Sequence, residues 1–240
     1  MSRDAGIDVA GNRAGDALGR VPGPGRWFGG VIASLVSVVA SLVAGVTGLA
    51  TRNPAAGFAG AVILVLGKVV AFGQSVLGLQ RQRALTGEET ALLTEVYGAS
   101  VDLSAVRLVP GRAGVFSTNP RPFTLGATIY LKKDALPGHV LVHECAHVWQ
   151  YQHMGPRYAF DAIWAQWRVK PDAYAWTDEL GRGKKHWREF NREAQAEFLQ
   201  DIARHDHAFF TTGEGFVLDG TDHTELARET LEQVRAGRLR

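Results

Sequence analysis

The chain has 240 residues, of which 46% are hydrophobic and 21% are charged, so it can bury a core and is not globally disordered. Its single cysteine, Cys145, excludes a disulfide framework within the chain and a cysteine-rich zinc module. The formal net charge of +2 argues against a dedicated nucleic-acid-binding protein, and we expect no nucleic-acid partner.

The charges are unevenly distributed and divide the chain near residue 83. Residues 1–83 carry eight Lys or Arg and three Asp, and the other 18 basic and 21 acidic residues follow. We expect a flexible tail over residues 1–26, a hydrophobic helical hairpin over residues 27–83 and a compact domain over residues 84–240.

The predicted hairpin consists of two apolar segments. No charged side chain occurs from Trp27 to Thr51, and the segment from Ala55 to Leu79 contains one charged side chain, that of Lys68. Each segment is longer than the roughly 20 residues that a helix needs to cross a bilayer. The first segment begins too late and runs too long for a cleavable signal peptide, so none is expected.

Three interpretations of the hairpin stay open. It could span a membrane through residues 27–80, with Arg26, Arg81, Arg83 and the C-terminal domain in the cytoplasm by the positive-inside rule. It could be a pair of buried, Ala- and Gly-rich helices of a soluble protein. It could also stay soluble until it is delivered and insert afterwards, as in some bacterial toxins. Lys68 would be unfavourable in a bilayer unless it faced a partner helix or water.

The rest of the chain predicts an α+β domain. A capping-box pattern at Thr86 and Glu89 opens a short helix. Residues 106–109 and 123–131 are β-prone, and Gly126 would form a bulge or bend within the second segment.

The C-terminal part has weaker patterns. Residues 165–188 lack a clean period and are expected to form a long, partly ordered loop that could act as a flap. Residues 222–235 predict a final amphipathic helix. Five tryptophans gather around these segments, at a density more typical of a core than of a cleft: Trp149, Trp164, Trp167, Trp176 and Trp187.

The most informative segment is a predicted helix that contains His143-Glu144-Cys145-Ala146-His147. Histidines four residues apart point the same way on a helix and can hold one metal ion. Glu144 could accept a proton from a metal-activated water and pass it to a leaving amine. Zinc is the expected metal because it takes nitrogen ligands in tetrahedral geometry. The alternative is a pair of hydrogen-bonded histidines with no ion, and Cys145 is expected to be a buried core residue.

A third ligand is expected from the helical segment 191–198. Glu193 and Glu197 share one face there, so one could bind the metal while the other supports a histidine. The spacing leaves open which of the two is the ligand, and both could be solvated glutamates on an exposed helix. An oxyanion stabiliser would come from a side chain near the metal. The candidates are Tyr158, Tyr174 and His186.

The histidine motif followed by Glu193 and Glu197 resembles the gluzincin group of zinc metallopeptidases. The resemblance implies that Glu193 is the third zinc ligand and that the acid four residues later supports a ligating histidine. Aspartate is usual at that second position, so Glu197 departs from the pattern.

A more extensive resemblance covers about residues 84–155. Its motifs, in order, are Val96–Gly98, Asp102–Arg107, Arg121–Tyr130 and Leu141–Gln152. This order is similar to the metallopeptidase core domain of bacterial contractile-injection-system toxins, and closer still to Vgr-related proteins of type VI secretion. It implies a zincin-like domain with a small sheet and a helix that carries the motif.

These patterns predict a zinc-dependent peptidase-like protein in a bacterial secretion or toxin context, in which metal-activated water hydrolyses a peptide bond of a peptide or protein substrate. Two alternatives stay open: a non-catalytic assembly or adaptor component of a secretion system, and a membrane-inserting effector. Secretion-system proteins and a membrane are the other expected partners. The protein is expected to be membrane-associated in bacteria, with a cytoplasmic C-terminal domain, or to be secreted by a contractile system.

Overall fold

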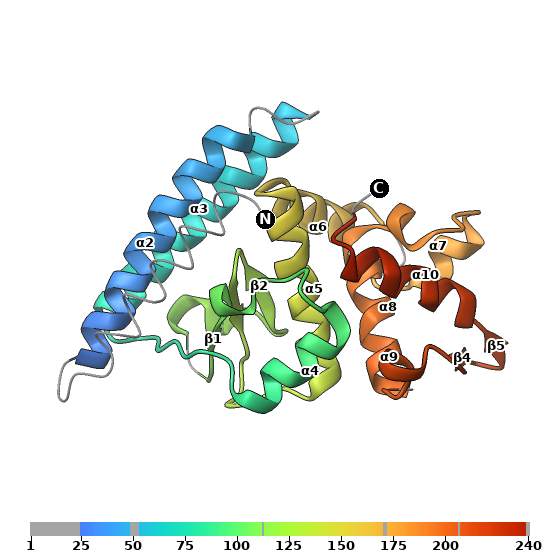
Figure 1. Ribbon diagram of the computed structural model, residues 1–240. Helices are drawn as coiled ribbons and strands as arrows, with labels where there is room; N and C mark the ends of the chain where they lie inside the picture. Colours follow the sequence, from blue (N-terminus) through green and yellow to red (C-terminus); the bar gives the residue numbers. More distant parts are fainter. Residues whose placement is uncertain (1–24, 49–52, 112, 170–171, 206, 239–240) are drawn as a thin grey trace.

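The computed structural model describes residues 25–48, 53–111, 113–169, 172–205 and 207–238 and shows an α+β protein that is mostly helical (Figure 1). Residues 1–24 of the predicted tail lie outside the described residues. The helices are α2 (Gly25–Gly48), α3 (Pro54–Val76), α4 (Gly87–Tyr97), α5 (Gly138–Met154), α6 (Arg157–Arg168), α7 (Trp176–Gly181), α8 (Arg192–His205), α9 (Phe209–Thr212) and α10 (Thr224–Arg235). The strands are β1 (Arg107–Val109), β2 (Phe123–Leu125), β3 (Thr128–Tyr130), β4 (Val217–Leu218) and β5 (Thr221–Asp222).

The helix predicted from the capping box is confirmed as α4. The Thr86 hydroxyl accepts the N–H of Glu89 at 3.2 Å, and the Glu89 carboxylate accepts the N–H of Thr86 at 2.8 Å. Arg83 donates two hydrogen bonds to the same carboxylate, at 2.7 and 2.8 Å, and these bonds hold the pKa of Glu89 below its ordinary value. The start of α4 is therefore fixed to the chain that leads out of the hairpin.

The three-stranded sheet has the order β1-β3-β2, with β1 parallel and β2 antiparallel to β3. The strand predicted at residues 106–109 is confirmed as β1. The β-prone segment 123–131 is not one strand, because the chain turns back at Gly126. This residue has a φ of +65°, in the left-handed region that glycine adopts without strain. The turn makes β2 an edge strand of the sheet.

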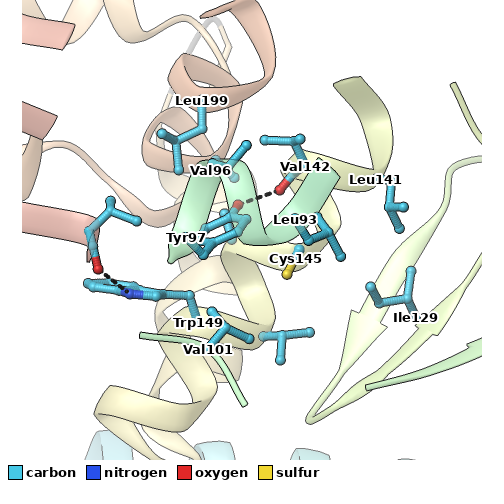
Figure 2. Close-up of a cluster of buried hydrophobic side chains, with 14 of the residues drawn as sticks. Leu93, Val96, Tyr97, Val101, Ile129, Leu141, Val142, Cys145, Trp149 and Leu199 are labelled. Atoms are coloured by element: carbon cyan, nitrogen blue, oxygen red, sulfur yellow. Dashed lines mark hydrogen bonds between the residues drawn. The ribbon is translucent and has the colours of Figure 1, made fainter. Parts of the chain in front are cut away.

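Helix α5 runs through the centre of the domain and contacts α4, α6, α8 and the sheet (Figure 1). Figure 2 shows its apolar side, where Val142, Cys145 and Trp149 pack among side chains of α4 and β3. The Tyr97 hydroxyl donates to the Val142 carbonyl at 2.6 Å, and the Trp149 indole donates to the Val234 carbonyl at 3.1 Å. Burial raises the pKa of the Cys145 thiol, which agrees with a core residue rather than a nucleophile.

The expectation of a long loop over residues 165–188 is wrong in part. Helix α6 continues to Arg168, and α7 and a short 3₁₀-helix (Trp187–Glu189) follow. These elements are too short to show a period in the sequence, and the buried side chains of Trp176 and Trp187 hold them to the core. Trp164 and Trp167, on α6, are 44% and 70% exposed instead.

Helices α2 and α3 form a hairpin that packs along one side of the domain (Figure 1). Among the described residues, α3 is the one helix whose length and apolar composition would allow it to cross a membrane. It lies close to the domain: a Cβ added at Gly60 would be 2.1 Å from the carbonyl oxygen of Pro156, and Leu64 is fully buried in the main core. The amine of Lys68 donates to the Thr128 hydroxyl of β3 at 2.9 Å. The last helix, predicted over residues 222–235, is confirmed as α10.

Candidate metal centre

Helices α5 and α8 together form a cluster of three buried side chains. His143 and His147 lie one turn apart on the same face of α5, and Glu193 comes from the first turn of α8. One potential ligand atom from each residue lies within 4.8 Å of the other two, so the cluster could hold a metal ion. The three residues are between 2% and 7% exposed.

Glu193 lies at similar distances from both histidines. Oε2 of Glu193 is 3.6 Å from Nε2 of His143 and 3.4 Å from Nε2 of His147. Two ligand atoms that each lie about 2.05 Å from a tetrahedral ion are separated by about 3.3 Å. The carboxylate therefore stands at nearly this distance from each imidazole, and the three ligand atoms all lie within 4.8 Å of one another.

A second group of side chains contacts the Nδ1 atoms of the two histidines. Nδ1 of His147 is 2.9 Å from Oε1 of Gln150, which is fully buried and also donates to the Arg192 carbonyl and to Gln195. This contact favours the tautomer with a proton on Nδ1 and leaves Nε2 free for a metal. Nδ1 of His143 is 3.1 Å from Oε2 of Glu197, an ion-pair distance without the alignment of a hydrogen bond.

Glu144 is 4% exposed and is held from the edge of the sheet. The hydroxyl of Thr124, on β2, donates to Oε2 of Glu144 at 2.7 Å. Burial raises the pKa of Glu144, although the two neighbouring histidines and Thr124 act in the opposite direction. The cluster thus has beside it a carboxyl group that can gain and lose a proton.

Tyr174 is the one predicted oxyanion candidate that contacts the cluster. Its ring stacks on His143 with the ring centroids 5.8 Å apart. The guanidinium carbon of Arg121 lies 4.8 Å from the centroid of the Tyr174 ring. Gln166 of α6 donates to the Tyr174 hydroxyl at 3.2 Å and to Oε1 of Glu193 at 2.8 Å. Gln166 therefore joins the tyrosine to the candidate ligand.

The other two oxyanion candidates have different partners. The Tyr158 hydroxyl accepts the N–H of Gly126 at 2.6 Å and supports the turn between β2 and β3. His186 pairs with Glu229 of α10, with 2.8 Å between Nδ1 and Oε1.

The cluster is strongly coupled electrostatically. Burial alone would lower the pKa of His143, but the carboxylates of Glu193 and Glu197 raise it to about 10. The pKa of His147 is raised in the same way by Glu193. Burial would raise the pKa of Glu193, yet the two histidines hold it well below its ordinary value. The carboxylates thus favour the protonated form of both imidazoles, and a metal ion would have to compete with those protons.

Sequence reasoning named Glu197 but missed three other residues that contact this site. Gln150 carried a usable signal, because it lies three residues after His147 on the same helical face. Thr124 and Gln166 carried none, since only the folding of β2 and α6 against α5 brings them to the cluster.

Among curated proteins, the chain is similar to the type VI secretion system spike protein VgrG2b of Pseudomonas aeruginosa, with 30% identity over 166 residues. The match covers 63% of this chain but only 16% of the spike protein, so the similarity relates part of one protein to a small part of the other. No protein-family model matches the chain. No solved structure matches it, and the zincin-like fold stays a prediction.

Proposed function

We propose that the protein is a zinc-dependent hydrolase of peptide bonds that acts in a bacterial secretion system. The observation that carries this proposal is the buried group of His143, His147 and Glu193, in which the carboxylate lies 3.4–3.6 Å from both imidazoles and Glu144 is the residue next to His143. The similarity to part of a type VI spike protein supports the secretion setting.

The proposal gives each side chain of the cluster a role. When bound, a zinc ion would lower the pKa of a water toward 7 and polarise a substrate carbonyl. The two histidines and Glu193 would hold the ion. Glu144 would accept the proton of the attacking water and donate it to the leaving amine, and its raised pKa suits a group that carries a proton for part of each cycle.

Tyr174 would stabilise the developing oxyanion. Burial, and then the negative charge of Glu193, raise the pKa of Tyr174, so its hydroxyl stays protonated and able to donate. Gln166 would hold this hydroxyl in place and leave Oε2 of Glu193 for the metal.

A second candidate function is a non-catalytic assembly component with a structural metal. The burial of the site favours it, because His143, Glu144, His147 and Glu193 are each at most 7% exposed. A substrate could reach them only if neighbouring side chains moved.

The test is proteolysis by the zinc-loaded full chain on a peptide library, with Glu144→Gln as the decisive variant. We expect the Glu144→Gln variant to keep its zinc and to lose at least about 100-fold in kcat/KM, because a glutamine side chain cannot relay the proton. Glu225→Gln, a change at a side chain that is 92% exposed on α10, is the matched control and should change neither. Cleavage that persists in Glu144→Gln would contradict the mechanism, and bound zinc without cleavage by any form would favour the assembly component.

A further inference from the structure

The hairpin has its polar side chains on the covered side. The Ser34 and Ser75 hydroxyls are 2.9 Å apart between α2 and α3, and both are buried. Lys68 donates to Thr128 of the sheet, and Oε1 of Gln74 accepts the N–H of Val115 at 2.6 Å. These four polar side chains thus meet the other helix of the hairpin or the domain.

The outward side of the hairpin is apolar. On α3, Phe58, Val62, Leu66 and Val69 follow each other at helical spacing and are between 39% and 62% exposed. On α2, a second stripe has exposed fractions between 47% and 53%: Phe28, Leu35, Val39 and Leu42. Lys68, at 4% exposed, is the one charged residue among residues 27–43 and 54–76. A helix pair on the surface of a water-soluble domain has the opposite polarity.

The chemistry of these stripes fits lipid better than a second protein. Protein interfaces use polar rims, aromatic anchors and arginines to set one register, and the two stripes are mostly aliphatic. Lys68 is buried and Arg83 is paired with Glu89, but the other basic residues among the first 83 still outnumber the acidic ones by six to three and complement anionic headgroups. Helix α3, with 23 residues, offers about 34 Å of such surface.

The contacts of α3 decide how the hairpin can meet the bilayer. The helix touches the domain near its start at Gly60, in its middle at Lys68 and near its end at Gln74. A docked α3 that crossed the membrane would pull the domain into the hydrocarbon, where loops with free polar backbone are excluded. An undocked α3 would leave Lys68 and Gln74 without these partners in lipid.

We infer that the outward face of the α2–α3 hairpin is a lipid-binding surface, which lies in the plane of an anionic bilayer while the domain stays docked on the other side. The surface needs no metal and no catalysis, so it is independent of the function proposed above. It replaces the membrane-spanning interpretation with one in which both ends of each helix stay on the same side of the bilayer.

The first experiment is flotation of the full chain with vesicles of phosphatidylcholine and phosphatidylglycerol. We expect the wild type to float with the vesicles, and the double variant Val39→Glu, Leu66→Glu to lose at least about 10-fold in partitioning. Val217→Glu is the control, because Val217 is 52% exposed on β4, away from the hairpin. Circular dichroism and melting curves establish that the variants are folded. Equal flotation of the double variant and the wild type, or no flotation of a folded wild type, would overturn the inference.

The second experiment separates the in-plane and spanning arrangements. Ala55→Cys places a thiol at the exposed start of α3, whereas the native Cys145 is fully buried and should not react. With the protein added outside the vesicles, a membrane-impermeant maleimide should label residue 55 without detergent. Protection that detergent removes would show that the hairpin spans the bilayer. A dimer in solution that Leu66→Glu dissociates would assign the face to a second copy of the chain instead.

Discussion

The cluster between α5 and α8 and the α2–α3 hairpin bury polar side chains in opposite surroundings. Around the cluster, the polar groups lie inside an apolar shell and each one contacts another polar group, as Gln150 contacts His147. In the hairpin, the polar groups also face inward, but the apolar side chains face outward. The first arrangement suits a charged ligand that is kept from water, and the second suits a helix pair with lipid on its outer side.

A buried polar group has a different meaning in each region. In the cluster it marks a candidate centre of chemistry, because the histidines and Glu193 converge on one point. In the hairpin, Lys68 and Gln74 mark which face is docked.

The largest effect is expected from removal of the metal. Binding to the folded state alone stabilises a protein by about 4 kcal/mol when the free metal is 1,000-fold above its dissociation constant. We therefore expect zinc to raise the melting temperature of the full chain and a chelator to reverse the shift, as measured by calorimetry. Glu193→Ala should abolish this response. A variant that melts higher with zinc to the same extent as the wild type would remove Glu193 from the site.

The hairpin can be undocked by one methyl group. In Gly60→Ala the new Cβ would be 2.1 Å from a backbone oxygen of Pro156, so we expect a loss of about 2 kcal/mol in the free energy of unfolding. Gly73→Ala is the matched control on the same helix, because nothing lies within 4 Å of its added Cβ. It should be neutral or stabilising by up to about 1 kcal/mol. Equal effects in urea unfolding would mean that α3 is not docked.

Glu179 supports the start of α8 and should make the stability depend on pH. Burial would raise its pKa, but Lys184, Arg182 and the N–H of Asn191 hold it below its ordinary value. The ionised form therefore stabilises the fold above about pH 4.3, and this contribution is lost as the pH falls. We expect Glu179→Gln to lower the free energy of unfolding by about 1–2 kcal/mol at pH 7 and by much less at pH 3. A difference that did not shrink with acid would contradict this role.

The smallest effect is expected at Thr124. Thr124→Val removes the hydroxyl that donates to Glu144, and we expect about a 10-fold loss in kcat/KM, equivalent to about 1.4 kcal/mol. Thr124→Ser keeps the hydroxyl and should recover most of the activity. Zinc content should be equal in the wild type and both variants, since the Thr124 hydroxyl donates to Glu144 and not to a candidate ligand. Loss of zinc in Thr124→Val would show that the residue supports the fold of the site instead.

Local patterns predicted the parts of the fold that local physics determines. The capping box gave the start of α4, and apolar spacing gave α5 and α10. The bend at Gly126 was foreseen, but not that it turns the chain into a hairpin, because a left-handed glycine permits both a bulge and a tight turn. Helix α7 is too short to have a period, so only its tertiary contacts define it.

The candidate site was predictable in its motif and less so in its geometry. The four-residue spacing places His143 and His147 together on any helix. It places Glu193 and Glu197 on one face equally well, and the position of α8 decides that Glu193 lies between the histidines while Glu197 lies against His143. The hairpin shows the same limit: length and composition gave two apolar helices, but the docked face follows from the domain beside them.

The most direct test of the account is the metal content of the full chain, purified without chelator and measured by plasma mass spectrometry. The account predicts about one zinc per chain in the wild type and in Glu144→Gln, and almost none in His147→Ala and in Glu193→Ala. A folded wild type that binds no zinc even when zinc is supplied would contradict the central claim. So would zinc that is retained at full stoichiometry by both ligand variants.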